Sequence, residues 1–127
     1  MVNFDFHKLL FPIEFENFCR DVLEIREKGK KFTTYKRGKD GGIDVRSTNT
    51  SEKIIAQCKL YNPNNYSGLI NNLKKEVTKC KRLKPDRYIV CINIELTPSR
   101  ASQIIEHFNG HILNEEDIID GIKLNKY

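Results

Sequence analysis

The sequence predicts a single α/β domain in which helices flank a central mixed β-sheet. Its 127 residues are enough for one modest core and too few for two. Segments with the 3.6-residue apolar period of helices alternate with short runs rich in β-branched and aromatic residues. The nearly continuous apolar run RYIVCINI, residues 87–94, is typical of a strand covered on both faces. The expected order is α-β-β-β-α-β-α-(β)-α, with the bracketed strand a short one.

The first helix is expected within FPIEFENFCRDVLEIREKG, residues 11–29. Its apolar stripe, spaced i, i+3, i+4, i+7 and i+8, consists of Phe15, Phe18, Cys19, Val22 and Leu23. Pro12 suits the first helical turn and Gly29 suits the position just past the end. The sequence therefore predicts an amphipathic helix over this segment.

Three strands should follow as an antiparallel meander. KFTTYKR (31–37), IDVRS (43–47) and KIIAQCKLY (53–61) have the composition of strands. The glycine turn GKDGG and the polar segment TNTSE connect them.

A second helix is expected over 69–83, with Leu69, Leu73, Val77 and Cys80 or Leu83 facing inward. A third should begin with Thr97 as its N-cap and Pro98 as its first residue. GHIL, residues 110–113, is the short bracketed strand, and NEEDIIDGI, residues 114–122, is expected to be a last helix capped by Asn114.

The charge is unevenly distributed along the chain. The net charge is +5, yet residues 29–87 hold fifteen Lys and Arg against five Asp and Glu, between acidic ends. Such a basic block attracts a polyanion, although a solvated face on one lysine-rich helix is the alternative. The predicted nucleic-acid contacts are Lys36, Arg37, Lys39, Lys74, Lys75 and Lys79.

The cysteines and the chain start indicate a cytoplasmic protein with no membrane partner. Cys19, Cys58, Cys80 and Cys91 form no CxxC motif, so they are interpreted as reduced core thiols and not as disulfides or zinc ligands. The start MVNFDFHKLLF does not resemble a signal peptide. No run approaches the roughly 18 apolar residues of a membrane span.

Lys59 is a candidate for a functional role, because it stands in the apolar strand IIAQCKL, where an unpaired charge is costly. Alternation along the strand places Gln57 and Lys59 on one face, and pairing with the previous strand can bring Asp44 beside them. A carboxylate and neighbouring oxygens suit Mg²⁺, and a nearby lysine can orient a water or neutralise charge. The predicted substrate is a phosphodiester.

The blocks FENFCRDVL, GKDGGIDV and IIAQCKLY resemble those of Mrr-type restriction endonucleases in the PD-(D/E)xK superfamily. The resemblance implies a restriction-endonuclease-like core and a metal-dependent endonuclease that cuts double-stranded DNA, with RNA as the alternative substrate. It assigns Glu16 as the helix glutamate, Asp44 as the metal-binding aspartate and Lys59 as the catalytic lysine. It also implies that Gln57 replaces the usual acid and that the Cys58 carbonyl binds the metal, Mg²⁺ with Mn²⁺ as the alternative.

The segments FDFHKLLFPIEFENFCRDVL, LTPSRASQI and NEEDIIDGI look most similar to the N-terminal nuclease domains of bacterial antiviral STAND-type NTPases. Residues 1–127 would then be one nuclease domain at the N-terminal part of a longer multidomain protein. The resemblance implies an effector in antiphage defence, with homo-oligomerisation or clustering through a C-terminal NTPase and sensor region.

Less specific interpretations remain open for the same residues. Glu16 can be an exposed glutamate at the border of its helix stripe, and Asp40 a turn residue bonding its own backbone. Because Gln57 lowers the negative charge of the site, the domain can also be a non-catalytic nucleic-acid-binding module. An oligomerisation module with a degenerate nuclease fold is the third alternative.

Overall fold

The structure, a computed structural model, describes residues 12–35, 45–108 and 115–126. A five-stranded sheet of order β1-β2-β3-β4-β5 forms its centre. The elements are α2 (Pro12–Arg26), β1 (Phe32–Thr34), β2 (Val45–Ser47), β3 (Ile54–Lys59), α3 (Tyr66–Leu83), β4 (Arg87–Ile92), α4 (Pro98–Phe108), the 3₁₀ turn η1 (Glu115–Asp117), β5 (Ile118–Ile119) and α5 (Gly121–Leu124). The predicted α/β fold is confirmed.

The sheet is mixed because two kinds of connection build it. β1, β2 and β3 pair antiparallel, with Val45 opposite both Thr34 and Ala56, which confirms the meander. β3 and β4 pair parallel from Ile54–Arg87 to Lys59–Ile92, and β4 pairs parallel with β5. Parallel neighbours need a crossover, which α3 supplies between β3 and β4 and α4 between β4 and β5.

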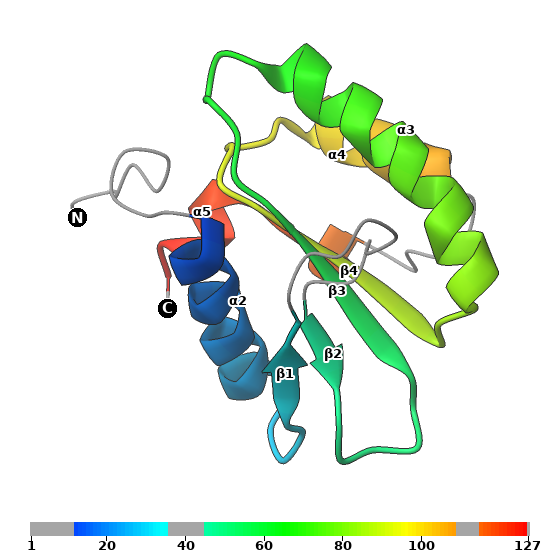
Figure 1. Cartoon of the computed structure of the whole chain (residues 1–127). Coiled ribbons are helices and arrows are strands. Elements are labelled where there is room, and N and C mark those ends of the chain that lie inside the picture. The colour runs from blue at the N-terminus through cyan, green and yellow to red at the C-terminus, as the bar shows by residue number, and fades with distance from the viewer. Residues whose placement is uncertain (1–11, 36–44, 109–114, 127) are drawn as a thin grey trace.

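Helices cover both faces of the sheet, with α2 and α5 on one side and α3 and α4 on the other (Figure 1). Alternate residues of β3 belong to the two cores. Ala56 and Cys58 pack with Cys19 and Leu23 of α2, whereas Ile55 packs with Leu73 of α3. Gln57 and Lys59 therefore lie on the side covered by α3 and α4, called here the α3 face.

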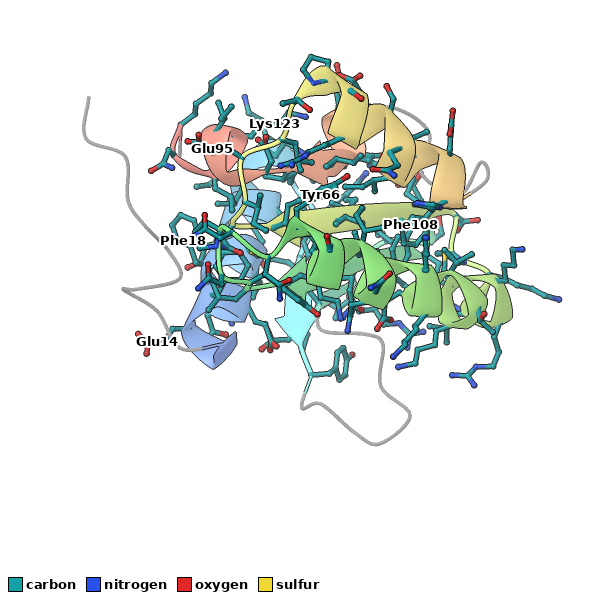
Figure 2. All side chains as sticks on the ribbon, turned by 90° about the horizontal axis from the view of Figure 1, so that it is seen from above. Glu14, Phe18, Tyr66, Glu95, Phe108 and Lys123 are labelled. Atoms are coloured by element: carbon teal, nitrogen blue, oxygen red, sulfur yellow. The ribbon has the colours of Figure 1, made fainter. Side chains whose placement is uncertain are left out.

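Side chains fill the space between the sheet and these two helices (Figure 2). The ring of Phe108 on α4 stacks on Tyr88 of β4 with 5.0 Å between centroids. No helix in the described ranges is long and apolar enough to span a membrane.

The local signals for helix ends are confirmed in two places. The first helix begins at Pro12, as predicted, and ends at Arg26, so Gly29 lies three residues past the end and not directly after it. Its φ of 84° is nevertheless in the left-handed region that favours glycine. At the start of α4, Thr97 Oγ1 accepts a hydrogen bond from the Arg100 N–H at 3.2 Å, which is N-cap geometry.

The prediction of one last helix over 114–122 is wrong. Residues 115–117 form η1, Ile118 and Ile119 form β5, and the helix is Gly121–Leu124. Its N-cap is Asp120, whose side chain accepts from the Lys123 N–H at 3.1 Å. Because Ile118 and Ile119 are buried beside β4, strand pairing outweighs the local helix pattern. Asn114 and the predicted strand 110–113 lie outside the described residues.

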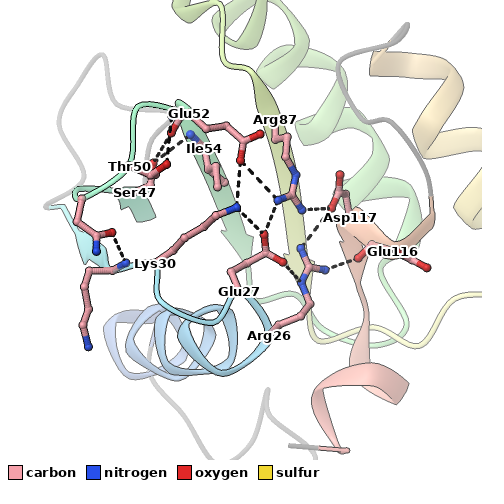
Figure 3. A network of polar contacts seen from close by, with 12 residues as sticks. Arg26, Glu27, Lys30, Ser47, Thr50, Glu52, Ile54, Arg87, Glu116 and Asp117 are labelled. Carbon is pink, nitrogen blue, oxygen red and sulfur yellow. Dashed lines mark hydrogen bonds and ion pairs between the residues drawn. The ribbon is translucent and has the colours of Figure 1, made fainter.

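A network of ion pairs joins the end of α2 to the start of β4 (Figure 3). Asp117 binds Arg87 at 2.8 Å and Arg26 at 3.2 Å, and Arg87 also binds Glu27. Because Arg87 begins β4 opposite Ile54, the last turn of α2 lies at the amino end of β3. The first turns of α2 consequently lie toward the carboxyl end of β3.

Candidate active site

Lys59 is the last residue of β3, and it has the acidic partner that its burial requires. Its side chain is 11% exposed, and its Nζ lies 3.3 Å from Oε1 of Glu76 on α3. The partner predicted for this lysine was Asp44, which lies outside the described residues. The acid that the structure does place beside Lys59 comes from the helix above the strand.

Glu76 is a site residue that the sequence interpretation missed. It is 5% exposed and belongs to the inward stripe of α3 with Leu69, Leu73 and Cys80. Val77, expected in that stripe, is half-buried. The available signal was position, since Glu76 stands three residues after Leu73 and four before Cys80, and these spacings share one helix face.

The two carboxylate oxygens of Glu76 differ in their surroundings. Oε1 lies 3.3 Å from the Lys59 ammonium and 3.9 Å from that of Lys79. Oε2 is buried and has no hydrogen-bond partner within the described parts of the chain. An ionised carboxylate accepts several hydrogen bonds or binds a cation, so Glu76 has unused binding capacity on the side of Oε2.

Gln57 is 2% exposed and lies on the α3 face two residues before Lys59. Alternate residues of a strand stand about 6.6 Å apart on the same face, which brings the amide and the ammonium to the same end of β3. Cys58, between them, points to the opposite side, where it packs with the α2 core.

Glu16 is 4% exposed, so the interpretation of an exposed border glutamate is wrong. It stands on α2, on the other side of the sheet from Lys59. Cys19, one turn further along α2, has its Sγ within 4.8 Å of the Cys58 Sγ. Glu16 precedes Cys19 by three residues, about 4.5 Å along the helix axis, and therefore lies near the level of the carboxyl end of β3.

The basic residues predicted to contact nucleic acid divide into three groups. Lys74 and Lys75 are exposed on α3. Lys79 is half-buried and lies within ion-pair distance of Glu76, so it belongs to the edge of the site more than to the open face. Lys36, Arg37 and Lys39 lie outside the described residues, as does Asp40.

The oxygen donors on the α3 face fit a hard divalent cation. The carboxylate of Glu76 and the amide of Gln57 are both buried, and oxygen ligands are those that Mg²⁺ and Mn²⁺ prefer. The buried Oε2 of Glu76 is the described atom that most favours this interpretation.

A second cluster on the α2 side suits a core better than a catalytic metal. The Sγ atoms of Cys19, Cys58 and Cys91 lie within 4.8 Å of one another, and all three residues are 0% exposed. Burial raises the pKa of the Cys19 thiol well above its usual value, whereas hydrogen bonds with Cys19 and Cys58 lower the pKa of the Cys91 thiol. A catalytic metal needs an open position for water or substrate, which three fully buried thiols do not offer, and the predicted core position of the cysteines is confirmed.

Known proteins match this chain over most of its length. A family model named Mrr_cat and described as restriction endonuclease matches residues 8–122. The uncharacterized protein y4cD of Sinorhizobium fredii (strain NBRC 101917 / NGR234) is 31% identical over 124 residues, which is 98% of this chain. The chain spans only 19% of the length of that relative. No solved structure gives a significant match.

Proposed function

We propose, since the chain belongs to the Mrr_cat family of restriction endonucleases, that it hydrolyses the phosphodiester bonds of double-stranded DNA with a divalent cation, Mg²⁺ or Mn²⁺. The observation that best supports this function is the end of β3. There Lys59 is held by a buried carboxylate on the same face as Gln57. A buried lysine and oxygen ligands together suit the chemistry of phosphodiester hydrolysis.

Each residue would have a separate role in this reaction. Asp44, the Gln57 side chain and the Cys58 carbonyl would hold the cation. A cation bound there would polarise the scissile phosphate and make a water more acidic. Lys59 would orient the attacking water and neutralise charge that develops on the phosphate. Glu16 would support the site from α2.

The exposed lysines of α3 would bind the DNA backbone. Lys74 and Lys75 are exposed on the helix that also carries Glu76, so a duplex lying along α3 would approach the carboxyl end of β3. Lysine contacts to phosphates are independent of base sequence. The cleavage is therefore expected to have no strict sequence preference.

In its biological context, the domain would be the DNA-cutting part of a longer antiphage protein. The small share of y4cD that the chain spans supports a place within a larger protein. Other regions of such a protein would bring copies of the nuclease domain together, as the resemblance to STAND-type proteins implies. These regions would also control when it cuts.

The proposal is tested by cleavage of supercoiled plasmid, linear DNA and RNA with and without Mg²⁺, at two protein concentrations. We expect Mg²⁺-dependent cutting of DNA, and its loss in Asp44→Ala and in Lys59→Ala. Lys126→Ala, an exposed lysine after α5, is the matched control and should cut normally. Circular dichroism establishes that each variant is folded. Undiminished cutting by either site variant, or no cutting by the unaltered chain, would overturn the proposal.

A further inference from the structure

The proposed cation site, as assigned so far, lacks the net negative charge that would favour a divalent cation. The residues of β3 on the α3 face are Ile55, Gln57 and Lys59, so this strand contributes one positive charge and no negative one. With Asp44 alone, the carboxylate and the ammonium would cancel. A hard divalent cation prefers anionic oxygen ligands, and a site of zero net charge would hold it weakly.

Glu76 is placed where it can reduce this deficit, and Lys79, 3.9 Å from its Oε1, offsets part of the added negative charge. It is the acid that contacts Lys59 in the described structure, at 3.3 Å. Its position in the apolar stripe between Leu73 and Cys80 is costly for a carboxylate unless the charge is compensated. Plain neutralisation of Lys59 uses only Oε1, whereas Oε2 is buried and has no hydrogen-bond partner in the described residues.

We propose that Glu76 supplies the second carboxylate of the divalent-cation site, replacing from α3 the acid that Gln57 does not provide on β3. Oε1 holds the Lys59 ammonium at the end of the strand, and Oε2 binds the cation. This inference rests on the proposed nuclease function and extends its ligand set to a residue outside the sequence motif. If Glu76 were purely structural, it would only pair with Lys59. Its removal would then change cation binding only through the ammonium that it leaves unpaired.

The test measures Mn²⁺ affinity by calorimetry on the 127-residue chain, without DNA. Glu76→Gln keeps the shape of the side chain and removes its charge. We expect this variant to bind Mn²⁺ about 10- to 100-fold more weakly. Glu76→Asp, which keeps the charge, should retain part of the affinity. The double variant Gln57→Glu/Glu76→Gln returns an acid to the strand and should regain affinity over Glu76→Gln.

A second pair of variants removes the influence of the lysine. Glu76→Gln leaves a buried ammonium without compensation, which can unfold the chain and also repels a cation. Lys59→Met and Lys59→Met/Glu76→Gln both lack that ammonium and differ only in the carboxylate. We expect Mn²⁺ to bind about tenfold or more tightly to the first than to the second. Thermal unfolding of each variant without Mn²⁺ verifies that it is folded.

The outcomes separate this inference from the function on which it rests. Equal Mn²⁺ affinity in the two Lys59→Met variants would overturn the role of Glu76. If Asp44→Ala still lost Mn²⁺ binding in that case, the nuclease proposal would stand. Absence of Mn²⁺ binding in the unaltered chain would overturn both.

Discussion

Gly121 lies where the start of α5 passes against the chain that follows β4. A Cβ at this position would lie 2.3 Å from the carbonyl oxygen of Asn93, and the Gly121 N–H donates to the carbonyl of Ile94 at 3.2 Å. Because the obstructing atom belongs to the backbone, it cannot move away as a flexible side chain would. The position therefore requires glycine for space, and its φ is not in the left-handed region.

Gly121→Ala is expected to lower the free energy of unfolding by about 1–3 kcal/mol, the usual cost of forcing extra volume into a packed region. Urea denaturation measures the change. Gly29→Ala is the comparison, since a Cβ there meets nothing within 4 Å but the φ is 84°, a conformation that costs roughly 1–2 kcal/mol. An unchanged stability of Gly121→Ala would mean that α5 can shift away from Asn93.

At the scale of elements, the ion pairs shown in Figure 3 connect the end of α2 to the sheet. Glu27, just past the end of α2, binds Arg87 of β4 and lies 3.4 Å from Lys30. Burial raises the pKa of Glu27, but the hydrogen bond and charge of Arg87, with the charges of Arg26 and Lys30, outweigh it. The pKa is consequently lowered from its ordinary value of 4.5.

A lowered pKa in the folded state means that ionised Glu27 stabilises the fold. The contribution is complete above the unfolded value near 4.5 and is lost as the pH falls through the folded pKa. At pH 7, Glu27→Gln should reduce the free energy of unfolding by about 2 kcal/mol, the scale of a charged hydrogen bond. The difference from the unaltered chain should shrink as the pH falls below 4.5 and through the lower folded-state pKa. Glu14→Gln, at an exposed position of the same helix, should show little change, and a difference for Glu27→Gln that does not depend on pH would contradict this account.

The elements show how far local pattern can specify the structure. Pro12 and Thr97 were sufficient to predict where two helices begin, because caps and turns are decided by neighbouring residues. In α3, residues 76 and 77 both follow Leu73 at a spacing that can face inward, and hydrophobicity favours Val77. Only the contact with Lys59 from another element explains why Glu76 is buried.

The prediction of one helix over residues 114–122 was wrong for a related reason. A strand of two residues, Ile118 and Ile119, has no periodicity of its own. It exists because the edge of β4 is available for parallel pairing. The site follows the same rule. Gln57 and Lys59 could be assigned to one face by alternation, whereas the acidic partner of Lys59 is on a helix, seventeen residues further along the chain.

At the scale of the whole molecule, the sheet separates two kinds of surface. α3, with its exposed lysines, covers the face that carries Gln57 and Lys59, and α2 and α5 cover the other (Figure 1). If DNA is bound for cleavage, its backbone should be held by the α3 side. The net charge of the chain alone would not distinguish the two sides.

Two double variants, each lacking two lysine charges, test this asymmetry. Their DNA binding is measured without a divalent cation, so that no cleavage occurs. Lys74→Gln/Lys75→Gln removes two charges from α3, and Lys28→Gln/Lys126→Gln removes two from exposed positions after α2 and α5. If the α3 lysines contact two phosphates, their loss should weaken binding and reduce the slope of log affinity against log salt by about 2, since each contact contributes about 0.9. The control pair lowers the net charge equally and should leave the slope nearly unchanged. Equal effects of both pairs would indicate attraction by net charge only, and a slope near zero in the unaltered chain would favour an oligomerisation module over a DNA-binding nuclease.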